Sequence, residues 1–133
     1  MEERLITELL AAVRKAGNAT LSLYEKDYHV EHKGDDSPLT EADLASHNIL
    51  VEALTKLTPE TPILSEESAD IPWTERAEWD EYWLIDPLDG TKEFIKKNGE
   101  YTINVALIKS GAPVFGIVFA PVLNTFYYGG SDG

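Results

Sequence analysis

The chain has 133 residues, the length of a single domain, and 43% of them are apolar, which excludes wholesale disorder. It contains no cysteine, which excludes a disulfide framework and a thiolate zinc site and favours a reducing compartment. The net charge of −13, from 11 basic and 24 acidic residues, argues against a nucleic-acid partner, because phosphate contacts are made mainly by Lys and Arg.

The N-terminal part of the chain predicts two helices. Apolar residues at helical spacing predict the first helix over residues 3–24, although Gly17 and Asn18 weaken its middle. The polar, turn-rich residues 29–38 predict a loop. The same helical spacing predicts a second helix over residues 40–57.

The rest of the chain predicts mostly strands. A short strand is expected at 63–65, and the apolar run 82–85 predicts a second one. Residues 66–80 are acidic and irregular, and 92–97 favour a short helix. Three further strands are expected at the β-rich runs 102–108, 114–119 and 125–128. Their short connections favour antiparallel neighbours, so the fold class is α+β, with two helices packed on a largely antiparallel sheet.

Two aspartates follow the second strand directly. Asp86 and Asp89 stand where the apolar run ends, with Pro87 and Leu88 between them. Carboxylates at the end of a buried strand are costly unless they are paired or bound to a cation. Magnesium prefers such hard oxygen ligands together with water and substrate phosphate. The spacing therefore suggests a cation site built from both carboxylates, with a backbone carbonyl between them.

The next two residues suggest a phosphate site. Gly90 lets the backbone approach a ligand closely, and N–H groups at a helix start near Thr91 would favour an anion. A structural interpretation stays open, because Asp89-Gly90 is typical of a type I′ hairpin. Asp89 is also a good helix cap, and Asp86 followed by proline is a common turn opener.

Two further carboxylates are candidates. Glu66 follows the strand at 63–65 and could share a cation with Asp86 or contact an attacking water, although paired glutamates are usually a solvated face. Asp43 could accept a hydrogen bond from a catalytic hydroxyl, or it could belong to a capping box that begins at Thr40. The three histidines show no metal-ligand spacing and are interpreted as ordinary surface or half-buried residues: His29, His32 and His47.

Together these stretches resemble a known family. Residues 82–94, Tyr-Trp-Leu-Ile-Asp-Pro-Leu-Asp-Gly-Thr-Lys-Glu-Phe, look like the signature of the inositol monophosphatase-like superfamily of lithium-sensitive phosphatases. The ending Leu-Asp-Gly-Thr-Lys-Glu-Phe resembles the 3′(2′),5′-bisphosphate nucleotidase branch. Residues 33–43, 62–67 and 98–108 match that branch in order and spacing. The implied fold is the first half of an α/β/α/β/α sandwich.

The resemblance assigns roles to these residues. Glu66, Asp86 and the carbonyl of Leu88 would bind one magnesium ion, and Asp86 with Asp89 would bind a second. The resemblance also implies a set of substrate-binding residues that overlaps the metal ligands: Glu66, Leu88, Asp89, Gly90 and Thr91. The catalytic residues would be Asp43, Glu66 and Thr91, with Asp43 orienting Thr91 and both Thr91 and Glu66 helping to activate water.

The resemblance also implies a substrate. It would be adenosine 3′,5′-bisphosphate, which loses its 3′-phosphate to give AMP in sulfur assimilation. Residues 1–133 would be a single N-terminal metal- and phosphate-binding domain, because the family's second half, with a Trp-Asp motif that completes the second metal site, is not in this sequence. An exposed face that normally meets that half would favour self-association. No signal peptide or spanning segment is recognised, so we expect a cytoplasmic location, with peripheral attachment at the inner membrane as a second option.

Three alternatives stay open. An inositol monophosphatase or a related sugar phosphatase is the nearest, although Lys92 and Glu93 favour the nucleotidase. A half-domain that binds cations without catalysis is the second. A plain acidic scaffold with no site is the third.

Overall fold

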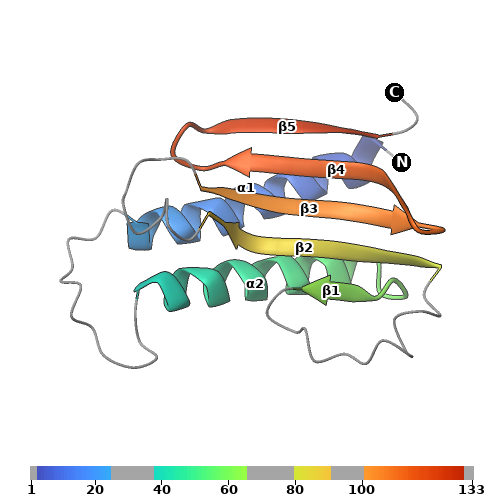
Figure 1. Cartoon of the computed structure of the whole chain (residues 1–133), viewed down its shortest axis with the longest axis horizontal. Coiled ribbons are helices and arrows are strands. Elements are labelled where there is room, and N and C mark those ends of the chain that lie inside the picture. The colour runs from blue at the N-terminus through green and yellow to red at the C-terminus, as the bar shows by residue number, and fades with distance from the viewer. Residues whose placement is uncertain (1–2, 25–37, 66–79, 91–100, 131–133) are drawn as a thin grey trace.

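The structure is a computed structural model that describes four stretches of the chain: 3–24, 38–65, 80–90 and 101–130 (Figure 1). Almost all of the predicted loop at 29–38, the irregular region before residue 80 and the predicted helix at 92–97 lie outside these ranges. Those three predictions therefore stay predictions.

Two helices precede the sheet. The first, α1, spans Glu3–Tyr24 as predicted, and the second, α2, spans Pro38–Leu57 and begins two residues earlier than predicted. Proline suits a first helical position because it lacks the N–H that would have no partner there. Thr40 therefore lies inside the first turn rather than at the cap. The capping-box interpretation of Asp43 is wrong for this reason.

The strands form one mixed sheet in the order β1-β2-β3-β4-β5. Among the strands that the structure describes, only β1 runs parallel to its neighbour, so the prediction of a largely antiparallel sheet is confirmed. The five strands have the following bounds: β1 Ile63–Ser65, β2 Glu81–Asp89, β3 Thr102–Lys109, β4 Ala112–Ala120 and β5 Thr125–Gly130. Ser110 and Gly111, with φ angles of 52° and 80°, form the two-residue hairpin between β3 and β4.

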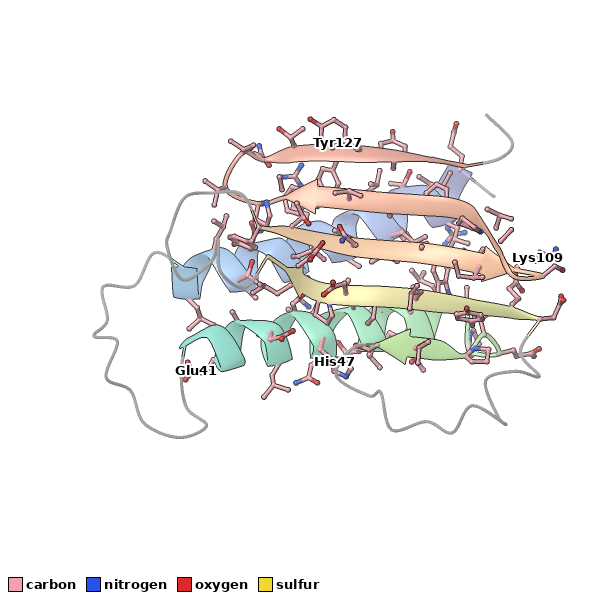
Figure 2. The ribbon with its side chains drawn as sticks, in the orientation of Figure 1. Glu41, His47, Lys109 and Tyr127 are labelled. Carbon is pink, nitrogen blue, oxygen red and sulfur yellow. The ribbon has the colours of Figure 1, made fainter. Side chains whose placement is uncertain are left out.

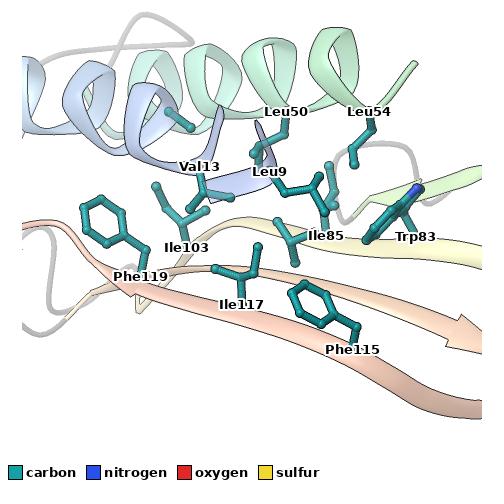
Figure 3. Close-up of a cluster of buried hydrophobic side chains, with 12 residues drawn as sticks. Leu9, Val13, Leu50, Leu54, Trp83, Ile85, Ile103, Phe115, Ile117 and Phe119 are labelled. Carbon is teal, nitrogen blue, oxygen red and sulfur yellow. The ribbon is translucent and has the colours of Figure 1, made fainter. Parts of the chain in front are cut away.

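Both helices lie on the same face of the sheet, and the core fills the space between them and the strands (Figures 1 and 3). Alternate residues of β2, β3 and β4 point into this space, as the two-residue period of a strand requires. The buried side chains come from all these elements: Leu9, Val13, Leu50, Leu54, Trp83, Ile85, Ile103, Phe115, Ile117 and Phe119.

Helix α1 approaches β4 closely at Gly17. A Cβ atom built there would meet the ring of Phe119 at Cε2 and Cδ2. That ring is fixed on its other sides, because it stacks on Phe126 with 4.0 Å between centroids and lies under the guanidinium of Arg14. Arg14 also donates to Oδ1 of Asn124 at 2.7 Å and so ties α1 to the turn before β5. Gly17 is thus a contact point rather than a weak point of the helix.

The face of the sheet away from the helices is called the outer face here, and Asp86, Asn104, Val118 and Tyr127 lie on it in one row across β2 to β5. Three apolar side chains on this face are exposed: Val118 by 39%, Leu84 by 42% and Tyr127 by 66%. Neither helix of the described residues covers this face (Figure 1). The outer face therefore combines acidic residues at one end with exposed apolar residues in the middle.

Candidate metal and phosphate site

A β-bulge near the end of β2 shapes the candidate site. Asp86 pairs with Asn104 and Asp89 pairs with Thr102, so Pro87 and Leu88 together face one residue of β3. The prediction that the strand stops before Asp86 is therefore wrong, since β2 continues to Asp89. A bulge also accommodates proline, which cannot donate to a regular ladder.

The bulge brings the two aspartates to the same face. Residues three apart in a regular strand point to opposite faces, but the extra residue of the bulge returns Asp89 to the side of Asp86. The type I′ hairpin alternative is excluded, because Asp89 pairs within the sheet and lacks the positive φ that such a turn requires. Only Gly90, with a φ of 99°, adopts the left-handed region there.

Leu88 anchors the bulge on the helix side of the sheet. Its side chain is 4% exposed and packs in a small cluster with Ala42 and Tyr101. Tyr101 is in turn hydrogen-bonded through its hydroxyl to the hydroxyl of Thr20 at 2.9 Å. Because Ala42 precedes the half-buried Asp43, this packing holds the first part of α2 beside the bulge.

Asn104 joins the site from β3. Its Nδ2 donates to Oδ2 of Asp89 at 3.1 Å, and its position in the strand is directly opposite Asp86. Its Oδ1 is buried and has no hydrogen-bond partner among the described residues. One side chain therefore lies beside both aspartates and keeps a buried acceptor unused.

The end of β1 reaches the same region. Ser65 is level with Ile85 in the parallel pairing, so the chain leaves β1 one residue short of the level of Asp86. Ser65 is 1% exposed, and its hydroxyl is hydrogen-bonded to Nδ1 of His47 on α2 at 2.9 Å. This bond fixes the end of β1 against the helix; Figure 2 shows His47 on the side of α2 near β1.

The sequence-predicted residues fall into two groups. Asp86, Leu88, Asp89 and Gly90 lie together at the end of β2, and Asp43 lies on the helix whose first turns pack on the bulge. The other two predicted residues, Glu66 and Thr91, lie outside the described residues. Their roles, and the contact expected between Asp43 and Thr91, stay predictions.

The donors present suit a hard cation but do not complete a site. Asp86 and Asp89 offer carboxylate oxygens on one face, and Asn104 adds a buried oxygen to which no described residue donates. These are oxygen ligands of the kind that magnesium prefers. Within residues 3–24, 38–65, 80–90 and 101–130, no three acidic or histidine side chains cluster closely enough to hold a metal ion alone.

Two contacts of the site were missed by sequence reasoning. Asn104 was counted only as part of a β-rich run, and His47 was interpreted as an ordinary surface or half-buried residue. His47 is half-buried as expected, but it bonds to Ser65. The available signals were a polar residue between Ile103 and Val105 and a histidine four residues after Asp43.

The sequence and the fold match a known protein family. The model of the inositol monophosphatase family matches residues 1–132, and the chain belongs to that family. The chain is 49% identical, over 93% of its length, to the 3′(2′),5′-bisphosphate nucleotidase CysQ of Salmonella typhimurium, and 48% identical, over 92%, to that of Escherichia coli K12. It spans about half the length of these curated relatives.

Solved structures agree. CysQ from Bacteroides thetaiotaomicron, a bacterial member of the family, superposes with a TM-score of 0.84 at 40% identity and covers 93% of this chain and 45% of its own. The Thermotoga maritima inositol monophosphatase TM1415 gives 0.75 at 27% identity, with 98% and 49% covered. The predicted fold class and family are thus confirmed.

Neither α1 nor α2 is apolar enough over its length to cross a membrane.

Proposed function

We propose that this chain is the metal- and phosphate-binding half of a magnesium-dependent phosphomonoesterase that converts adenosine 3′,5′-bisphosphate to AMP in sulfur assimilation. The observation that carries the proposal is the bulge that gathers Asp86 and Asp89 on one face beside Gly90. The similarity to CysQ proteins, at 40–49% identity over most of this chain, supports the nucleotide as substrate.

The residue roles follow the family pattern. Glu66, Asp86 and the carbonyl of Leu88 would hold one magnesium ion, and Asp86 with Asp89 a second. Bound magnesium would neutralise the phosphate oxygens and stabilise the leaving oxygen. Lithium would inhibit the reaction, as in the family.

Other residues would bind the phosphate and activate the attacking water. Backbone N–H groups of Gly90 and Thr91 would bind the phosphate. The hydroxyl of Thr91, oriented by Asp43, and the carboxylate of Glu66 would together activate the water that attacks phosphorus, and the proton of that water would pass to a carboxylate. The bond between phosphorus and the 3′ oxygen would then break, and that oxygen would take a proton from a second water.

Assembly and location complete the proposal. Residues 1–133 act as one domain in a cytoplasmic setting. The exposed outer face around Val118 and Tyr127 favours self-association. One alternative of another class is a half-domain that binds cations without catalysis.

The test is phosphate release from adenosine 3′,5′-bisphosphate and from inositol 1-phosphate, each with and without magnesium, with Asp86→Asn as the control. Magnesium-dependent release from the nucleotide that is lost in the variant supports the proposal. Preference for inositol 1-phosphate supports the monophosphatase instead. If neither substrate is hydrolysed but Mn²⁺ binds and Asp86→Asn abolishes that binding, the chain is the non-catalytic half-domain.

A further inference from the structure

Asn104 is an unusual residue for its position. It stands near the start of β3, between the buried Ile103 and Val105. Asparagine is depleted in strands, where β-branched and aromatic residues are favoured. Threonine or valine would therefore suit the strand better at this position, which suggests that the amide of Asn104 has a specific role.

The nitrogen of the amide makes a hydrogen bond. Nδ2 donates to Oδ2 of Asp89 at 3.1 Å. Because Asp89 is exposed, that carboxylate would otherwise sample several rotamers in water. The hydrogen bond restricts it, and it turns Asp89 toward the row of the sheet that holds Asp86.

The other half of the amide lacks a partner. Oδ1 is buried and accepts no hydrogen bond from the described residues. Its neighbours in the row are the carboxylate of Asp86 on one side and the apolar Val118 on the other, and neither side chain offers a donor when Asp86 is ionised. Among the described residues, therefore, no donor faces this buried oxygen.

We propose that Asn104 is a positioning residue of the cation site, which holds the carboxylate of Asp89 through Nδ2 in the orientation that a bound cation needs. Residues that orient ligands in this way usually change metal affinity by about 10–100-fold. The inference deepens the proposed function and rests on its assignment of Asp86 and Asp89 as ligands.

The sharpest variant is Asn104→Leu, which keeps the size and branching of the side chain and removes both polar groups. The variant removes a buried acceptor that has no partner among the described residues and one hydrogen bond to the exposed Asp89, so the metal-free protein should change little in stability. The expected result is a melting temperature without cation that is little changed, together with Mn²⁺ affinity lowered about tenfold or more. Asn104→Thr, which suits a strand and carries no amide, answers the same question if the leucine variant does not fold.

The measurement is titration of the full chain with Mn²⁺, followed by the electron paramagnetic resonance signal of free Mn²⁺ and repeated with Mg²⁺ as competitor. Asn48→Ala, an exposed asparagine on α2, is the matched control and should bind as the parent does. Equal affinity in parent and Asn104→Leu overturns this inference alone. A weaker affinity that comes with a markedly lower metal-free melting temperature also overturns it, because the fold is then damaged. No saturable binding in the parent overturns the proposed function itself.

Discussion

Asp86 and Asp89 lie on the same face of the sheet although they are three residues apart in one strand. A regular strand would send Asp89 into the core between the sheet and the helices, where an unpaired carboxylate is costly. The bulge at Pro87 and Leu88 avoids this and leaves both carboxylates available on the outer face. The site therefore depends on what holds the bulge in place.

Leu88→Ala should weaken that hold. The side chain is buried against Ala42 and Tyr101, so truncation should lower the free energy of unfolding by about 2–4 kcal/mol, and Mn²⁺ binding should weaken with it. Leu84→Ala is the control, because Leu84 lies in the same strand but is 42% exposed and should change stability by less than about 0.5 kcal/mol. Urea unfolding followed by tryptophan fluorescence measures the free energy of unfolding of both variants. Equal losses in the two variants would contradict the anchoring role.

The sequence predicted the elements well and the geometry of the site less well. Helical spacing and β-rich runs are local signals, so α1, α2 and the strands appear where the pattern placed them, within a few residues. The bulge could not be predicted, because it is defined by the register between β2 and β3 rather than by either strand alone.

The same limit explains the missed contacts. Asn104 meets Asp89 across 15 positions of sequence, and His47 meets Ser65 across 18. Such pairs depend on how helix and sheet pack, which residue spacing does not encode. The resemblance to a family supplied the ligand roles, and those for Glu66 and Thr91 stay predictions.

Gly17→Ala should destabilise the protein although alanine is the better helix former. The added methyl group would overlap the ring of Phe119, which cannot move freely between Phe126 and Arg14. Overpacking costs about 1–3 kcal/mol, and the gain in helix propensity of about 1 kcal/mol offsets only part of it. Thermal unfolding of Gly17→Ala beside Gly129→Ala tests this, because no atom lies within 4 Å of a Cβ built at Gly129. A rise in melting temperature for Gly17→Ala would contradict the close approach.

Replacing each of two buried serines with alanine should change the free energy of unfolding differently. Ser65→Ala removes the hydrogen-bond partner of His47 and should lower the free energy of unfolding by about 1–2 kcal/mol. Ser46→Ala should leave it unchanged or raise it slightly, because Oγ of Ser46 is buried without a partner among the described residues and alanine favours the helix. Urea denaturation of the pair is the measurement. If both variants lose the same stability, the bond to His47 does not anchor the end of β1.

Val118→Lys should reduce self-association. Val118 lies in the middle of the outer face, next to Tyr127 on β5, which Figure 2 shows along the edge of the sheet. If copies meet through this face, a lysine there would be buried on association and should weaken it about tenfold or more. Leu123→Lys is the matched control, because Leu123 is 67% exposed but lies in the turn between β4 and β5. Sedimentation velocity over a range of concentrations measures the change. If Leu123→Lys disperses the assemblies and Val118→Lys does not, copies associate through the turn and the outer face is not the contact.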